Sequence, residues 1–243
     1  MQSTLGEFRE TETGQAFTKQ NSKLLKVELN QITIQAKLGS MVAYQGDVRF
    51  EHAGSGGMGR MLKKAVSGEG TQLMKITGTG EVFLAHFAQD IHLLKLENEA
   101  ITCNGANVLA FDAGIDWDIK RAEGMSSMMG GGGLYNMSLA GAGWVAVMSD
   151  GPPVLLSTGP ETPTFADPQA AITWSGNLQT TVKTDVNLKT FIGKGSGESV
   201  QVGFVGQGWV LVQPSEGAVH MQPGAGGSSG GGGGGGLLGQ LGG

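Results

Sequence analysis

Residues 134–148 read LYNMSLAGAGWVAVM, an alternating strand that runs through Gly-x-Gly into a second alternating strand. The same pattern occurs at 72–85, QLMKITGTGEVFLA, and at 199–213, SVQVGFVGQGWVLVQ. Glycine adopts positive φ angles without a Cβ clash, so two alternating runs across a glycine pair are typical of a tight β-hairpin. We therefore expect a β-hairpin at each Gly-x-Gly. The pairs begin at Gly78, Gly141 and Gly206, and this nearly even spacing predicts a chain built by internal repetition.

The strands after the glycine pairs keep one phase. Side chains alternate between the two faces of a strand, so Val82, Val145 and Val210 lie on equivalent faces of their strands. We expect that face to form core. The opposite face includes Trp144 and Trp209, and it is expected to be partly exposed or to meet another surface.

The sequence before each glycine pair also repeats. Residues 24–26 match 93–95, and residues 32–33 match 101–102 at the same offset; a weaker third version begins at Val154. These matches predict an all-β fold of three tandem repeats, 23–87, 91–149 and 153–214. A unit of about 60 residues buries little surface alone. We therefore expect the repeats to form a single β domain over 23–214, with pseudo-threefold symmetry. Residues 1–22 form an N-terminal segment with possible edge strands near Phe8 and Phe17.

Each repeat carries an insertion, at 54–68, 124–133 and 189–197. Residues 58–66 in the first insertion are good helix formers between glycine-rich flanks, and they predict one short helix. Arg60, Lys63 and Lys64 would lie opposite its apolar stripe, where they could contact an anion or a partner. A solvated helix face is the plainer interpretation of the same three residues.

The chain ends in GAGGSSGGGGGGGLLGQLGG at 224–243. Polyglycine has high backbone entropy and no side chain to bury, so residues 215–243 are expected to form a flexible, disordered tail. Leu237, Leu238 and Leu241 near its end could dock on a partner as an apolar hook, or they are incidental leucines in a disordered terminus.

Composition narrows the class of protein. The net charge is −5 with no large basic block, so charge gives no support to non-specific nucleic-acid binding. The single cysteine, Cys103, excludes an intramolecular disulfide and a multi-cysteine zinc site. Residues 1–13 lack the apolar region of a signal peptide, and no apolar run reaches the roughly 18 residues of a transmembrane helix. We expect a bacterial cytoplasmic protein.

No set of residues predicts catalysis. Gly54, Gly56 and Gly59 fit the G-x-G-x-x-G spacing of a dinucleotide-binding turn, but no βαβ context follows them. His86 and His92 have no carboxylate or cysteine at ligand spacing. The aspartates fit a polar sheet face, although a weak cation site stays open: Asp112, Asp116 and Asp118. Cys103 lies in a predicted strand, where thiols are usually buried and inert. We therefore predict no catalytic, cofactor or metal residues.

Trp144, Trp174 and Trp209 come from strands of the second and third repeats. They could form core, a subunit interface, or a surface on which nucleic-acid bases stack.

Three runs of sequence resemble a known family: SMVAYQGDVRFE at 40–51, GEGTQLMKITGTGEVFLA at 68–85 and GLYNMSLAGAGWVAVMSDG at 133–151. They resemble the altered-inheritance-of-mitochondria family of mitochondrial biogenesis proteins and its bacterial relatives, over about residues 23–214. The resemblance implies a β fold similar to the tryptophan RNA-binding attenuation protein (TRAP), triplicated in one chain. It implies no catalytic residues, because the family supplies none. The polyglycine tail indicates a bacterial member.

These observations favour a non-enzymatic scaffold, a homo-oligomeric β body that presents glycine-rich loops and a tail to protein partners. The alternative is single-stranded nucleic-acid or small-ligand binding through aromatic stacking, which the TRAP-like resemblance suggests. A third hypothesis is an enzyme that pairs Asp112 or Asp116 with His86 or His92. Peripheral membrane contact by the first insertion is left open.

Overall fold

The structure is a computed structural model that describes residues 4–52, 72–121, 135–184 and 200–215. These ranges are all-β, as expected, with two 3-10 helices, η1 and η2, as their only helical elements. The predicted helix at 58–66 and the predicted flexible tail lie outside them. In chain order the elements are η1 (Leu5–Phe8), β1 (Phe17–Asn21), β2 (Leu24–Asn30), β3 (Ile34–Lys37), β4 (Met41–His52), β5 (Leu73–Leu84), β6 (Asp90–Asn104), η2 (Gly105–Asn107), β7 (Val108–Asp112), β8 (Asp116–Arg121), β9 (Tyr135–Ser149), β10 (Val154–Thr158), β11 (Thr164–Ala166), β12 (Ala171–Ser175), β13 (Gln179–Thr184), β14 (Val200–Val205) and β15 (Gly208–Val212).

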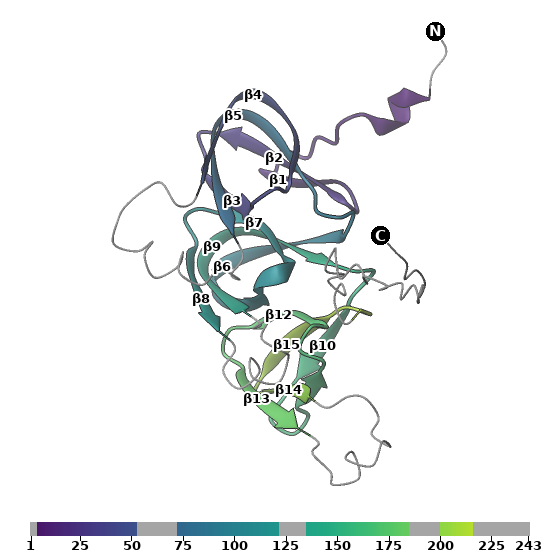
Figure 1. The fold of residues 1–243 in the computed structure, drawn as a ribbon, viewed down its shortest axis with the longest axis vertical. Helices are drawn as coiled ribbons and strands as arrows, with labels where there is room; N and C mark the ends of the chain where they lie inside the picture. The colour runs from purple at the N-terminus through teal and green to yellow at the C-terminus, as the bar shows by residue number, and fades with distance from the viewer. Residues whose placement is uncertain (1–3, 53–71, 122–134, 185–199, 216–243) are drawn as a thin grey trace, which may run out of the picture.

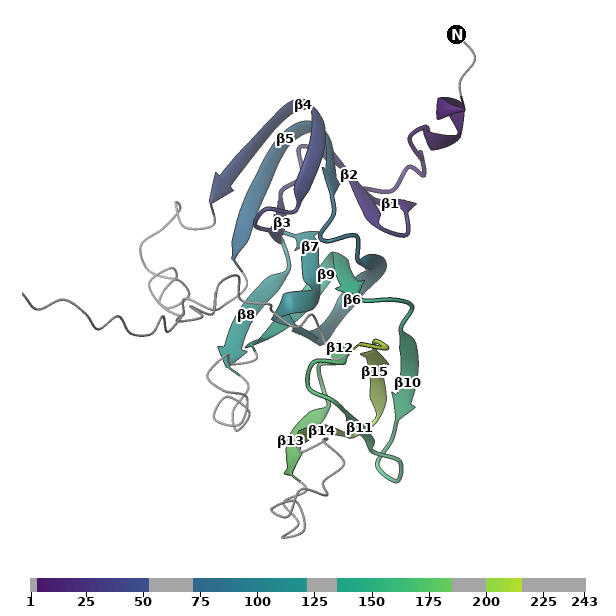
Figure 2. The same cartoon turned by 45° about the vertical axis from the view of Figure 1, so that its right-hand side comes forward.

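Twelve of the strands form one antiparallel sheet along the long axis of the molecule (Figure 1). Its main path runs β1-β2-β5-β3-β7-β9-β6-β12-β15-β10, with β4 added on β5 and β8 added on β9. The remaining three strands form a smaller sheet in the order β11-β14-β13. The strands with the lowest numbers therefore lie at one end of the molecule, and β13 and β14 lie at the other (Figures 1 and 2).

Strand β5 is continuous through its glycine pair. Gly78 and Gly80 have φ angles of 125° and 146°, and β5 pairs with β4 on one side along its whole length. On its other side β5 pairs first with β3 and then with β2. The positive φ angles bend the strand so that its two halves have different neighbours on this side.

The other two glycine pairs follow the same rule. Strand β9 runs through Gly141 and Gly143, pairs with β6 along its length, and pairs with β8 before the bend and β7 after it. At Gly206 the strand is interrupted, so that β14 pairs with β13 and β11, and β15 pairs with β12 and β10. The hairpins predicted at the Gly-x-Gly sites are therefore wrong. The first two pairs bend a continuous strand, and the strands on either side of Gly206 pair with other strands and not with each other.

Antiparallel hairpins occur instead between β1 and β2, where Asn21 pairs with Leu24, and across the three insertions. His52 pairs with Met74, Arg121 with Tyr135, and Thr184 with Val200. Each insertion therefore joins the paired ends of two adjacent antiparallel strands, at 53–71, 122–134 and 185–199.

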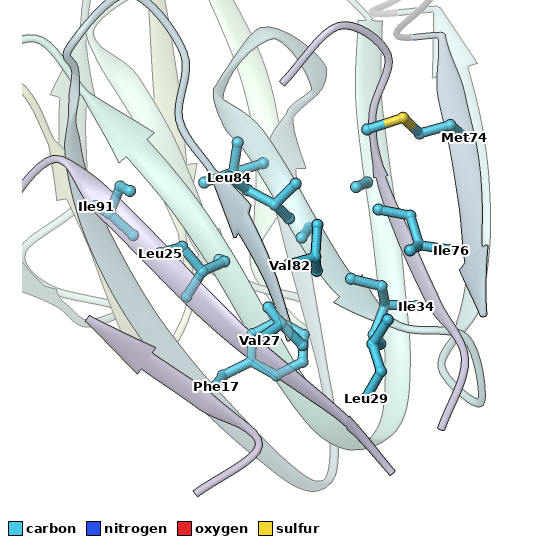
Figure 3. Close-up of a cluster of buried hydrophobic side chains, with 14 of the residues drawn as sticks. Phe17, Leu25, Val27, Leu29, Ile34, Met74, Ile76, Val82, Leu84 and Ile91 are labelled. Carbon is cyan, nitrogen blue, oxygen red and sulfur yellow. The ribbon is translucent and has the colours of Figure 1, made fainter. Parts of the chain in front are cut away.

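Three buried clusters fill the body. The first lies under β1, β2 and β5, and Figure 3 shows Phe17, Leu25, Val27 and Ile34 pointing into it. Strand β9 contributes to two clusters, because Ala146 and Met148 enter the first while its other face enters the second. The third cluster is the smallest and gathers the last strands: Ala171, Trp174, Leu178, Val202, Phe204 and Val210.

Two local predictions had opposite outcomes. Val82, Val145 and Val210 are all fully buried, which confirms the predicted core face. At the N-terminus, Phe17 begins the edge strand β1 and is buried against the first cluster. The strand predicted near Phe8 is wrong, because Phe8 lies in η1, whose residues are all exposed.

Candidate binding surfaces

Trp174 belongs to the core. Its side chain is 5% exposed in β12, and its ring meets that of Phe204 edge-on at a centroid distance of 5.1 Å. Trp174 therefore presents no free ring face on which a base could stack.

Trp144 and Trp209 directly follow the second glycine of their bends and are both partly buried. The backbone N–H of Trp144 donates to Asp112 Oδ2 at 2.6 Å, and the backbone N–H of Trp209 donates to Ser175 Oγ at 3.0 Å. These bonds anchor the bent strand to the strand beside it at matching positions. The Trp144 ring stacks on Phe17, with centroids 6.5 Å apart.

A pocket of about 290 Å³ lies beside Trp209 where β6 meets β12. Its lining combines an indole ring with one carboxylate, one hydroxyl and one amide, a mixture that suits a small planar ligand with polar substituents. The lining residues are Glu99, Ala100, Ile101, Ser175, Asn177 and Trp209.

Among the predicted titratable candidates, Asp112 and His92 have hydrogen-bond partners, whereas Asp116 and Asp118 are exposed. Burial raises the pKa of Asp112, against the lowering effect of the Trp144 N–H. His92 Nε2 lies 2.8 Å from Ser149 Oγ, and that hydroxyl donates to the Gly151 carbonyl. Burial lowers the pKa of His92, with a further lowering by Lys19 and an opposing effect of Asp90.

His86 and Cys103 are also held locally. The His86 ring lies against Phe87 at a centroid distance of 4.3 Å, and burial followed by the charge of Lys37 lowers its pKa. The Cys103 thiol donates to Thr173 Oγ1 at 3.2 Å, and burial raises its pKa to about 12. Within the described ranges, no group of three His, Cys, Asp or Glu side chains could hold a metal ion.

Lys26 is a buried charge that the sequence analysis did not identify as a site. Its side chain is 1% exposed, and its Nζ donates to Glu81 Oε1 at 2.8 Å. Glu10 and Glu28 lie 3.6 and 3.8 Å from the same Nζ. The hydrogen bond from Lys26 lowers the pKa of Glu81, and the bond to Glu81 raises that of Lys26 despite burial. The alternating pattern of β2 does not reveal this network, because it places Lys26 on the polar face of the strand, where an exposed lysine is expected.

The first half of β4 carries exposed apolar side chains along an open edge of the sheet. Residues 41–47 are all exposed, with Met41, Val42 and Tyr44 at 37%, 58% and 50%. Among the described strands, β5 is the sole neighbour of this half of β4. Such an open apolar strand edge is a template for pairing with another chain.

The remaining predicted site residues lie outside the described ranges: Arg60, Lys63, Lys64, Leu237, Leu238 and Leu241. No helix in the described part of the chain is both long and apolar enough to cross a membrane.

Comparison with known proteins agrees with this architecture. A family model described as mitochondrial biogenesis AIM24 matches residues 16–215. The X-ray crystal structure of protein SPYM3_0169 from Streptococcus pyogenes has a similar fold, with a TM-score of 0.66 and 22% sequence identity. That match covers 82% of this chain and 92% of the other. No curated protein sequence matches the chain.

Proposed function

The chain belongs to the mitochondrial biogenesis AIM24 family, and from this premise we propose that it is a non-enzymatic β scaffold. In this proposal three copies of one bent-strand unit form the body, as in the TRAP-like architecture that the family resemblance implies. The body presents its three strand connections, and the glycine-rich tail, to protein partners. The single cysteine favours a reducing compartment, so we propose the bacterial cytoplasm as its location.

The strand registers support the repeated unit. Leu29 faces Gly80 as Leu96 faces Gly143. In the same way Tyr44, Phe111 and Trp174 face Val82, Val145 and Val210 in turn, which makes the three facing residues counterparts. The register also corrects the sequence match of Leu25 with Leu94. Leu25 faces Leu84 as His92 faces Val147, so His92 is its counterpart and the match was wrong by two positions.

In each proposed unit we call the strands the first, second and third run, in chain order. The first runs are β2–β3, β6 and β10–β11. The second runs are β4, β7–β8 and β12–β13. The third runs are β5, β9 and β14–β15, and each lies between the other two runs of its unit.

The observation that carries the scaffold function is the placement of the connections. All three join the end of a second run to the start of a third run, between directly paired residues. The antiparallel body thus places 53–71, 122–134 and 185–199 between matching strand ends, and segments that connect strands commonly carry binding functions. Three described side chains of types that can act in catalysis form hydrogen bonds to neighbouring strands: Asp112, His92 and Cys103.

Loop replacement tests the scaffold. Because His52 pairs with Met74, Asn-Gly in place of 53–71 forms a four-residue turn with Gln72 and Leu73 and leaves the strands in place. The same replacement suits 122–134 and 185–199. We expect the full chain to retain specific partners in a pulldown, and the triple replacement without 216–243 to lose them at an unchanged melting temperature. Equal capture by both chains, or no capture by the full chain, would refute the proposal.

The pocket beside Trp209 supports a second candidate, a small aromatic ligand that stacks on the indole. The burial of Trp174 and the acidic net charge disfavour an extended nucleic-acid surface. Titration of tryptophan fluorescence with nucleosides and free aromatic amino acids tests this candidate. Quenching that disappears in Trp209→Phe and persists in Trp144→Phe supports it, and the absence of quenching by any of these compounds removes it.

A further inference from the structure

We propose that copies of this chain assemble head to tail, with β11 of one copy pairing with residues 41–45 of β4 in the next. The predicted register sets Phe165 opposite Tyr44, Thr164 opposite Gln45 and Ala166 opposite Ala43. The proposal rests on the repeated unit of the proposed function and names a second copy of the chain as a partner.

The junctions inside the chain supply the template. Strand β3, the end of the first unit's first run, pairs with β7, the start of the second unit's second run, and Gln35 faces Phe111. The next junction repeats this pairing between β6 and β12, where Thr102 faces Trp174. Both junctions are antiparallel and involve three residues from each strand.

Within the described sheets, the first and third units each lack one pairing partner. The register against the third runs makes Thr164, Ile101 and Ile34 equivalent, since they face Phe204, Leu139 and Ile76. Strand β11 is therefore the third unit's counterpart of β3, yet β14 is its sole neighbour in the described sheets. Tyr44 is the counterpart of Phe111 and Trp174, and its strand likewise has an open side.

Burial marks the open side as an interface. Residues 108–111 and 171–174 are buried throughout, whereas the equivalent residues 41–44 are exposed throughout. All three stretches are mostly apolar, MVAY beside VLAF and AITW. Phe111 and Trp174 are 0% and 5% exposed, against 50% for Tyr44. On the other open edge, Phe165 is 46% exposed.

The three buried clusters indicate where an apolar side chain of the interface would insert. Leu109 of the second unit inserts into the first cluster, and Ile172 of the third unit inserts into the second. Val42 is the equivalent residue of the first unit. In the assembly it inserts into the third cluster of the preceding copy, the one cluster among the described residues that receives no such side chain.

Pairing within a single chain is ruled out by distance along the molecule. Strand β4 lies at one end of the body and β11 lies beside β14 at the other (Figure 2). The contact is therefore heterologous, since each copy uses β4 on one neighbour and β11 on the other, and it generates rings or filaments rather than isolated twofold dimers.

Disulfide trapping tests the register. Chains with Tyr44→Cys and chains with Phe165→Cys are mixed and mildly oxidised; Cys103 stays in place because its thiol is buried. We expect a cross-linked pair in the mixture and none in either variant alone or in the wild type. No cross-link in the mixture, or a cross-link within one variant, would overturn the proposal.

Molar mass by light scattering provides a second test that does not remove the aromatic pair. We expect the wild type to exceed twice 25.0 kDa and Val42→Lys to fall to a folded monomer. Val182→Lys, on the outer edge of β13, should keep the wild-type mass. A wild-type monomer, or an unchanged mass for Val42→Lys, contradicts the proposal. A monomeric Val42→Lys chain that captures partners through its loops separates this proposal from the scaffold function.

Discussion

Gly46 and Gly80 face each other across β4 and β5 at the point where both strands bend. A Cβ on Gly80 would lie 2.0 Å from the Gln45 carbonyl oxygen, and a Cβ on Gly46 would lie 2.6 Å from the Thr79 carbonyl oxygen. The bend thus brings two backbones so close that neither position admits a side chain.

This close approach predicts a difference between two glycines of positive φ angle. Gly141 has a φ of 127°, but a Cβ added there would meet only Ile115 Cα, at 3.9 Å. We expect Gly141→Ala to cost about 1–3 kcal/mol from backbone strain. Gly80→Ala should cost about 1–3 kcal/mol more, because the strand must also move away from Gln45. Urea unfolding checks this order. Equal losses of unfolding free energy in the two variants would show that the close approach of the strands does not affect stability.

The buried Lys26 predicts an acid-sensitive contribution from Glu81. The lowered pKa of Glu81 means that its stabilisation is present above about pH 4.5 and is lost as pH falls through the lower value. We expect Glu81→Gln to destabilise the protein by about 1–3 kcal/mol at pH 7, with the difference from wild type shrinking in acid. Glu28→Gln is the control, since Glu28 is more exposed and 3.8 Å from Nζ, and it should cost under about 1 kcal/mol. A Glu81→Gln effect that does not change with pH would contradict the ion pair.

Ionisation of Asp112 affects the stability in the opposite direction to ionisation of Glu81. Its pKa is raised by burial, so its charged form costs stability above the raised value, and this cost disappears as pH falls. Its structural role is to accept the Trp144 N–H. Asp112→Asn keeps an acceptor and should retain near wild-type stability at pH 7, whereas Asp112→Ala should lose about 1–3 kcal/mol. Thermal unfolding of the two variants decides this, and equal effects would argue against the bond.

Chemical labelling of the Cys103 thiol should report the unfolding of the protein. A buried thiol with a pKa of about 12 offers almost no thiolate at pH 7. We expect no labelling by a thiol reagent in native buffer, and labelling in urea that follows the loss of β structure. Rapid labelling of the native protein would show that the β6–β12 junction opens locally.

The sequence predicts the fold class because short apolar runs recur on both sides of the glycine pairs, as they do in β5 and β9. It did not distinguish a hairpin from a bend, because a positive-φ glycine pair serves both. The distinction depends on whether the two halves of the strand pair with each other or with separate neighbours, such as β2 and β3. The error of two positions in the repeat arose similarly, because a shift of two preserves which face each side chain occupies.

The candidate site was less predictable. Residue type groups Trp174 with Trp144 and Trp209, but in the strand registers Trp174 takes the place that Tyr44 and Phe111 take beside Val82 and Val145. Residues 41–44 are as apolar as 108–111 and 171–174, so their composition gives no sign that they are exposed. Strands β3 and β6 pair with the stretches that contain 108–111 and 171–174, and in the proposed assembly a second copy supplies the equivalent strand for 41–44.

The most direct test of the account is an experimental structure of the native assembly, in which the Cα atoms of Tyr44 and of Phe165 in the neighbouring copy are located. Directly opposed residues of an antiparallel pair lie about 4.5–5.5 Å apart, and we predict that separation at every junction between copies. A β4 edge that faces solvent, or that pairs with β4 of another copy, would contradict the account.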